Sequence, residues 1–128
     1  MEKYLFIGLG GFIGSIARYA LSNAVYRAAG ESFPYGTLTV NLIGCFFIGI
    51  LMTLFQERFV VQPNLRLFII IGILGGFTTF SSFSYETFAL LKAGNLIDAA
   101  MNSILSLIGC LVATWGGYMI AKNLWGTP

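Results

Sequence analysis

Residues 74–86, LGGFTTFSSFSYE, place a glycine pair and five Ser or Thr residues inside an apolar segment that is long enough to cross a membrane. The glycines and the β-branched Thr78 and Thr79 weaken a helix. Counted from 67 to 91, this segment has its centre at Thr79, so we predict an interrupted helix at mid-membrane depth. Backbone groups freed there must meet protein, water or an ion, because lipid offers no hydrogen bonds. Interrupted helices at this depth mark ion and substrate sites in transporters, so the sequence predicts a site here.

The whole chain has the composition of a membrane protein. Of its 128 residues, 57% are hydrophobic and 9% are charged, and its apolar stretches are near or above the ~20 residues that a spanning helix needs. We therefore predict an all-α fold with a single membrane domain over residues 1–128 and no soluble domain. The predicted spans are 4–28, 35–57, 67–91 and 97–122. Hydrophobicity continues past Arg18, which favours a retained first span over a cleaved signal.

Several classes of site are excluded by what the sequence lacks. It has no histidine, which removes histidine-ligated metals, haem and histidine proton relays. Its two cysteines, Cys45 and Cys110, both fall inside predicted spans, so we interpret them as packing residues rather than a disulfide framework. A net charge of +2 forms no basic patch, so we expect no nucleic-acid partner. We also expect that the protein is not an enzyme.

The Lys and Arg residues give only a weak orientation signal. Four would lie on the side of the two termini and two on the other: Lys3, Arg58, Arg66 and Lys122 against Arg27 and Lys92. So small a bias permits insertion in both directions, which would let two copies pair in opposite orientations. The charge count alone fits a protein with a single orientation equally well.

The residues after the glycine pair form two neighbouring stripes on a helix. Phe80 and Phe83 share one face, and Ser81 and Ser84 share the next. Aromatic ring edges are positive and hydroxyl hydrogens can turn toward an anion, so these stripes suit an anion without its water shell. The alternative is that the hydroxyls bond to their own helix while the rings face lipid.

Polar residues in the other spans fit the same interpretation. Asn41 lies within the second span, where it offers two donors to an anion or a bond to a neighbouring helix. Arg18 should face water, a carboxylate or an anion vestibule, unless it snorkels to the interface. On the fourth span, polar or thiol side chains recur every four residues and predict one thinly polar face. They are Asn102, Ser106, Cys110 and Thr114.

These motifs together resemble the Fluc (CrcB) family of fluoride channels. The resemblance rests on GTLTVNLIG at 36–44, on LGGFTTFSSFSYE at 74–86, on Arg18 and on four short spans, and it covers essentially the whole chain. It implies an antiparallel, dual-topology homodimer in the bacterial inner or plasma membrane, with two fluoride pores and a central structural sodium ion. It also implies passive export of cytoplasmic fluoride.

The resemblance also implies roles for particular residues. The sodium ligands would be the backbone carbonyls of Gly75 and Thr78 from both subunits. Asn41, Phe80 and Phe83 would contact fluoride, and Arg18 matches the basic residue of the first span. The remaining pore residues would be the hydroxyls of Ser81, Ser82, Ser84 and Thr114, together with Cys110 and the carboxylate of Glu86 near one pore end. The chain departs from the family pattern at Cys110, where a hydroxyl is usual, and at Asn102, where a relative has tyrosine.

Two other functions remain open. A small dual-topology multidrug or cation exporter also has four spans, but such proton-coupled proteins need a membrane carboxylate, typically in the first span. Here the first span has none, and Glu86 lies toward the end of the third. A structural or assembly subunit would leave the hydroxyl cluster unexplained.

Overall fold

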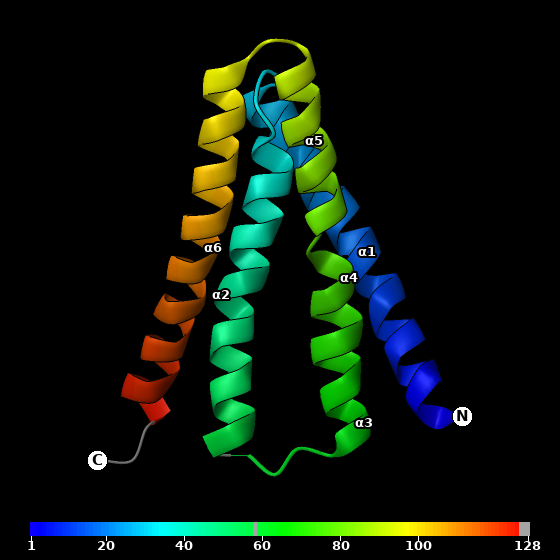
Figure 1. Ribbon diagram of the computed structural model, residues 1–128. Helices are drawn as coiled ribbons and strands as arrows, with labels where there is room; N and C mark the ends of the chain where they lie inside the picture. Colours follow the sequence, from blue (N-terminus) through cyan, green and yellow to red (C-terminus); the bar gives the residue numbers. More distant parts are fainter. Residues whose placement is uncertain (58, 126–128) are drawn as a thin grey trace.

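The computed structural model describes residues 1–57 and 59–125, which are helical over most of their length (Figure 1). The elements in chain order are α1 (Glu2–Ala29), α2 (Tyr35–Glu57), α3 (Pro63–Arg66), η1 (Leu67–Leu74), α4 (Gly75–Phe77), α5 (Phe80–Lys92) and α6 (Leu96–Trp125). Helices α1, α2 and α6 and the run 63–92 are each long and apolar enough to cross a membrane. The chain is thus an all-α, multi-pass membrane protein.

The run 63–92 is not a uniform α-helix. It begins at Pro63, which is favoured at a first helical position because its missing N–H would have no partner there. The eight residues of η1, which follow α3, form a π-helix. The sequence does not predict this winding. Gly75 accordingly donates its N–H to the carbonyl of Ile70, five residues earlier.

Two pairs of helical segments pack closely where a glycine meets a neighbouring backbone: α1 with η1, and α2 with α6. On α1, a Cβ at Gly10 or Gly14 would overlap the carbonyl oxygen of Phe68 or Ile73. Between α2 and α6, which run in the same direction, a Cβ at Gly49 would overlap the Thr114 carbonyl in the same way. Small residues are how membrane helices reach such close backbone contact.

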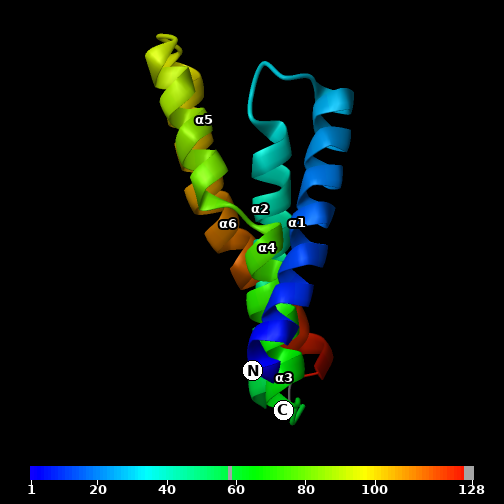
Figure 2. The same cartoon turned by 90° about the vertical axis from the view of Figure 1, so that its right-hand side faces the viewer.

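The four spans separate into two groups at one end of the molecule (Figure 2). Figure 2 shows α5 and the first part of α6 leaning away from α1 and the first part of α2. Most large apolar side chains of α1 are exposed, Phe12 and Tyr19 by about 70% (67% and 71%). A surface of this kind suits contact with lipid or with another copy rather than with water.

Candidate functional site

Two residues with extended backbone angles separate α4 from α5. Thr78 has φ −85° and ψ 156°, and Thr79 has φ −150° and ψ 114°. The N–H of Thr79 bonds to the side chain of Asn41 instead of the carbonyl of Gly75, four residues earlier. The N–H of Ser82 likewise bonds to Thr79 Oγ1 instead of the Thr78 carbonyl. The carbonyls of Gly75 and Thr78 therefore lose their helical donors.

Asn41 is bonded to both backbone groups of Thr79. Its Oδ1 accepts from the Thr79 N–H at 2.8 Å, and its Nδ2 donates to the Thr79 carbonyl at 3.0 Å. Asn41 is 8% exposed, so these bonds are shielded from competing solvent. The second hydrogen on Nδ2 is left over for another acceptor.

Thr79 also begins helix α5 and gathers hydroxyls around it. Its Oγ1 caps the helix by accepting from the Ser82 N–H, which is a favoured role for threonine. The same atom lies 3.2 Å from Ser81 Oγ and 3.1 Å from Ser82 Oγ. Three hydroxyl groups therefore meet at one point beside the extended residues.

A groove of about 520 Å³ opens on one side of Thr79, and we call it the Asn41 groove. It is lined from α2 by Asn41 and Cys45, from the third span by Thr78, Thr79, Phe80 and Phe83, and from α6 by Ser103, Ser106, Leu107, Cys110, Leu111 and Thr114. The Phe80 and Phe83 rings are tilted by 50° with their centroids 5.3 Å apart. Phe80 is 79% exposed in a single chain. The groove therefore combines an amide, hydroxyls, thiols and ring edges.

A smaller cavity of about 210 Å³ lies on the other side of Thr79, and we call it the Arg18 cavity. Its lining includes Arg18, Thr37, Ser82 and Glu86. Arg18 Nε donates to the Gly76 carbonyl at 3.1 Å, which gives a partner to another carbonyl near the end of α4. Arg18 therefore bonds to protein and lies in the same cavity as a carboxylate.

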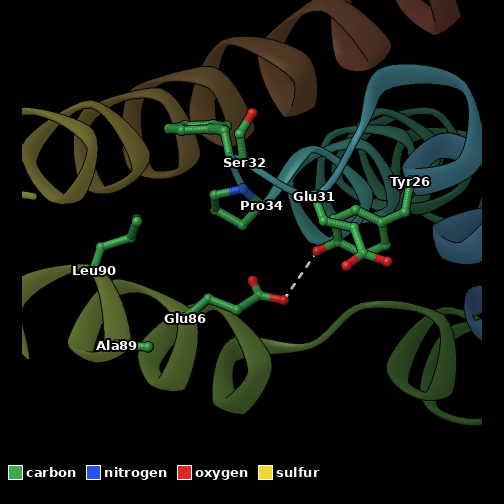
Figure 3. A pocket seen from close by; sticks show the side chains of 8 residues that line it. Tyr26, Glu31, Ser32, Pro34, Glu86, Ala89 and Leu90 are labelled. Atoms are coloured by element: carbon green, nitrogen blue, oxygen red, sulfur yellow. Dashed lines mark hydrogen bonds between the residues drawn. The ribbon is translucent and has the colours of Figure 1, made fainter. Parts of the chain in front are cut away.

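Glu86 lies between the Arg18 cavity and an outer cavity of about 380 Å³, which is lined by Tyr26, residues 31–34, Glu86, Ala89 and Leu90. Its Oε1 accepts from the Tyr26 hydroxyl at 3.1 Å (Figure 3). The same atom accepts from Thr37 Oγ1 at 2.7 Å. Its Oε2 is buried and has no hydrogen-bond partner in the described part of the chain. Three cavities thus follow one another, with Glu86 and Thr79 at the two boundaries.

The structure divides the predicted pore residues into three groups. Asn41, Phe80, Phe83, Cys110 and Thr114 line the Asn41 groove, and Arg18, Ser82 and Glu86 line the Arg18 cavity. Ser81 contacts the Thr79 hydroxyl, whereas Ser84 is exposed on the surface of α5. Of the polar residues predicted on the fourth span, Asn102 is buried and donates to Thr87 Oγ1 at 2.9 Å.

Several residues of these cavities are not among the predicted site residues, and four of them matter for the geometry above. Cys45 and Ser103 line the Asn41 groove, and Thr37 and Tyr26 hold Glu86. A signal exists for two of them, because Thr37 and Cys45 lie four residues before and after Asn41 and share its helix face. The role of Tyr26 depends on a contact across 60 positions of sequence and has no local signal.

Comparison with known proteins gives consistent results over nearly the full chain. The family described as "CrcB-like protein, Camphor Resistance (CrcB)" matches residues 5–118. A protein of Citrifermentans bemidjiense named "Fluoride-specific ion channel FluC" is 50% identical over 124 residues, which cover 97% of this chain and all of that protein. Proteins of the same name from Geobacter sulfurreducens and Opitutus terrae are each 48% identical, with 97% of this chain covered. The chain therefore belongs to the CrcB family, and the relatives it resembles are named as fluoride-specific ion channels.

Proposed function

We propose that this chain forms a fluoride-selective channel that exports cytoplasmic fluoride passively through two pores in an antiparallel homodimer. The names of its relatives support the transported ion. The observation that carries the proposal is the Asn41 groove, where donors and ring edges converge beside Thr79. No bond is made or broken in transport, so the function needs no enzyme chemistry.

The groove offers what a dehydrated small anion requires. Fluoride is strongly hydrated, so a selective path must replace its water with fixed donors. Asn41 would supply its unused Nδ2 hydrogen, and Phe80 and Phe83 would offer positive ring edges. The Thr114 hydroxyl donates to the Cys110 carbonyl at 3.0 Å and would have to leave that bond to meet an anion. The Arg18 cavity would form the next part of the path, with Ser82 and Glu86 on its wall. Ser81 would add a hydroxyl beside Thr79, Ser84 would add one on the α5 surface, and Cys110 would add a weak donor.

The exposed backbone near Thr78 supports a second copy. Gly75 is exposed in a single chain, and its carbonyl has lost the helical donor. A carbonyl without a hydrogen-bond donor cannot face lipid at mid-membrane depth. In the described residues, Lys3, Arg66 and Lys122 lie toward one end, and Arg27 and Lys92 toward the other, while Arg58 lies outside them. The small difference in the number of Lys and Arg residues between the two ends suits insertion of copies in both orientations.

The same carbonyls fit a structural sodium ion. Hard cations take oxygen ligands, and broken helices in transporters supply them as free carbonyls. Gly75 and Thr78 are the residues whose helical donors bond elsewhere, to Asn41 and to the Thr79 hydroxyl. Two copies would contribute four such oxygens, and a bound cation would neutralise their partial charges at the centre of the dimer.

The driving force would be the membrane potential. An inside-negative potential favours exit of an anion by about 2.3 kcal/mol per 100 mV. Fluoride that enters as neutral HF dissociates in a less acidic cytoplasm, so a passive pore is enough to lower its concentration there.

Purified protein in liposomes tests this proposal. We expect fluoride efflux, measured with a fluoride electrode, to proceed without a proton gradient and to exceed chloride efflux by a wide margin. Equal passage of chloride, or dependence on a proton gradient, would contradict the proposal and favour an exporter.

Replacing sodium by a large organic cation during purification should lower the melting temperature of the dimer. An unchanged melting temperature would remove the sodium ion from the proposal.

Orientation needs a separate measurement. In cells, an impermeant maleimide should label about half of the copies of a Glu31→Cys variant, because Glu31 is exposed in the loop between α1 and α2. The remaining copies should react once the membrane is permeabilised. Complete labelling, or none, before permeabilisation would argue for a single orientation.

A further inference from the structure

Two thiols from different helices line the Asn41 groove. Cys45 comes from α2 and Cys110 from α6, both line the groove, and neither is in a disulfide. The Cys45 side chain is a close neighbour of the Cys110 side chain. The interpretation of both cysteines as packing residues does not account for their pairing in the groove that Asn41 lines.

The approach of α2 and α6 explains why the thiols meet. The helices run in the same direction, and the missing side chain of Gly49 lets the Thr114 carbonyl come close to α2. Cys45 lies four residues before Gly49, and Cys110 lies four residues before Thr114. Each cysteine is thus about one turn from the point of closest approach, on the same face of its helix.

We propose that Cys45 and Cys110 form a binding site for a soft divalent cation that prefers two ligands in a line, the class to which Hg²⁺ belongs. Thiolates are soft ligands and select soft metals. Two S–H bonds break, two S–metal bonds form and two protons leave, so the product carries no net charge. A neutral product is favoured within a membrane, where an isolated ion would be expensive.

Other metals fit the site poorly. Zn²⁺ in structural sites takes four ligands, usually from cysteine and histidine. The described residues contain no group of three or more His, Cys, Asp or Glu side chains that could supply them. Neighbouring hydroxyls such as Ser106 and Thr114 are hard ligands and would add little affinity for a soft cation.

Occupation of this site should obstruct the groove. Cys110 and Cys45 lie in the same cavity as Asn41, Phe80 and Phe83, so a bound metal would sit among the side chains assigned to the anion path. This consequence rests on the proposed function, whereas metal binding itself does not.

The test is titration of reduced, full-length protein with Hg²⁺, followed by thiolate-to-metal charge-transfer absorption and by proton release. We expect one metal ion and two released protons per chain. Either Cys45→Ser or Cys110→Ser should weaken binding roughly 100-fold in competition with a small thiol, because the second ligand then no longer binds within the same molecule. Two metal ions per chain, or equal affinity in both single variants and the wild type, would overturn the inference.

A matched variant tests whether tight metal binding needs the positions of Cys45 and Cys110 or only two thiols in the same groove. Cys110→Ser combined with Ser106→Cys keeps two thiols but moves one of them about one turn along α6. This double variant should bind as weakly as Cys110→Ser alone, and wild-type affinity in it would contradict the proposed geometry. Size-exclusion elution checks the folding of each variant, and the stoichiometry and proton release of the wild type decide the matter if a variant does not fold.

Fluoride efflux provides the separate functional measurement. Hg²⁺ should inhibit efflux in the wild type much more strongly than in Cys45→Ser. Tight binding with one ion per chain but undiminished efflux would support the metal site and count against the groove as the fluoride path.

Discussion

Asn41 Oδ1 accepts a hydrogen bond from the Thr79 N–H while Asn41 Nδ2 donates to the Thr79 carbonyl, at 2.8 and 3.0 Å. One side chain of α2 thereby satisfies both backbone groups of a residue that lies outside any helix. One Nδ2 hydrogen remains unused, and both residues line the Asn41 groove. The bond pair thus stabilises the extended backbone, and under the proposed function it would also position Asn41 for an anion.

Asn41→Asp should reduce both properties. A carboxylate keeps the acceptor but loses the donor to the Thr79 carbonyl, and it would repel an anion. Losing one such buried bond typically costs about 1–3 kcal/mol. We expect a lower melting temperature with the dimer intact, and fluoride efflux at least tenfold slower. Asn102→Asp is the control, because Asn102 is equally buried but bonds to Thr87. Equal loss of efflux in both variants would indicate a general packing defect.

The local backbone of the site is more predictable from sequence than its contacts. A glycine pair followed by two β-branched threonines has poor helix propensity, so the extended angles of Thr78 and Thr79 follow from local chemistry. The depth of this segment in a membrane remains a prediction. The winding of η1 has no such cause in residues 67–74, which are strongly apolar and carry one glycine.

The contacts of the site depend on residues far apart in the chain. Thr37 and Tyr26 reach Glu86 across 49 and 60 positions, and nothing near Glu86 predicts them. The helical spacing of Thr37, Asn41 and Cys45 shows which residues share a face, but not which helix that face meets. Which helices meet is decided by the packing of glycines against facing backbones, and this packing involves residues that are distant in sequence.

Phe80→Ile should slow fluoride efflux while leaving the proposed dimer assembled. Isoleucine keeps an apolar side chain but lacks the positive ring edge that an anion would contact. We expect a reduction of tenfold or more in liposome efflux. Phe88→Ile is the matched control, because Phe88 lies on the same helix and is 61% exposed. Wild-type efflux in Phe80→Ile would remove this ring from the path, and so would an equal loss in Phe88→Ile.

Thr37→Val should destabilise the protein by about 1–3 kcal/mol. The change removes the 2.7 Å donor to Glu86 Oε1 and leaves a shielded carboxylate with the Tyr26 hydroxyl as its remaining described partner. Thr37→Ser keeps the hydroxyl and should retain most of the stability. Thermal unfolding in detergent measures both variants. An unchanged melting temperature in Thr37→Val would show that the hydrogen bond to Glu86 contributes no net stability.

Gly14→Ala and Gly11→Ala should have opposite effects although they lie three residues apart on α1. A Cβ at Gly14 would overlap the Ile73 carbonyl, whereas a Cβ at Gly11 meets no atom within 4 Å in a single chain. Backbone cannot yield as a flexible side chain does, so Gly14→Ala should cost about 1–3 kcal/mol through overpacking. Gly11→Ala should be neutral or stabilising by up to about 1 kcal/mol, because alanine favours a helix. Thermal unfolding of the two variants in the same detergent compares them directly. Equal destabilisation would mean that a partner chain covers Gly11, which would place that face of α1 in the dimer contact.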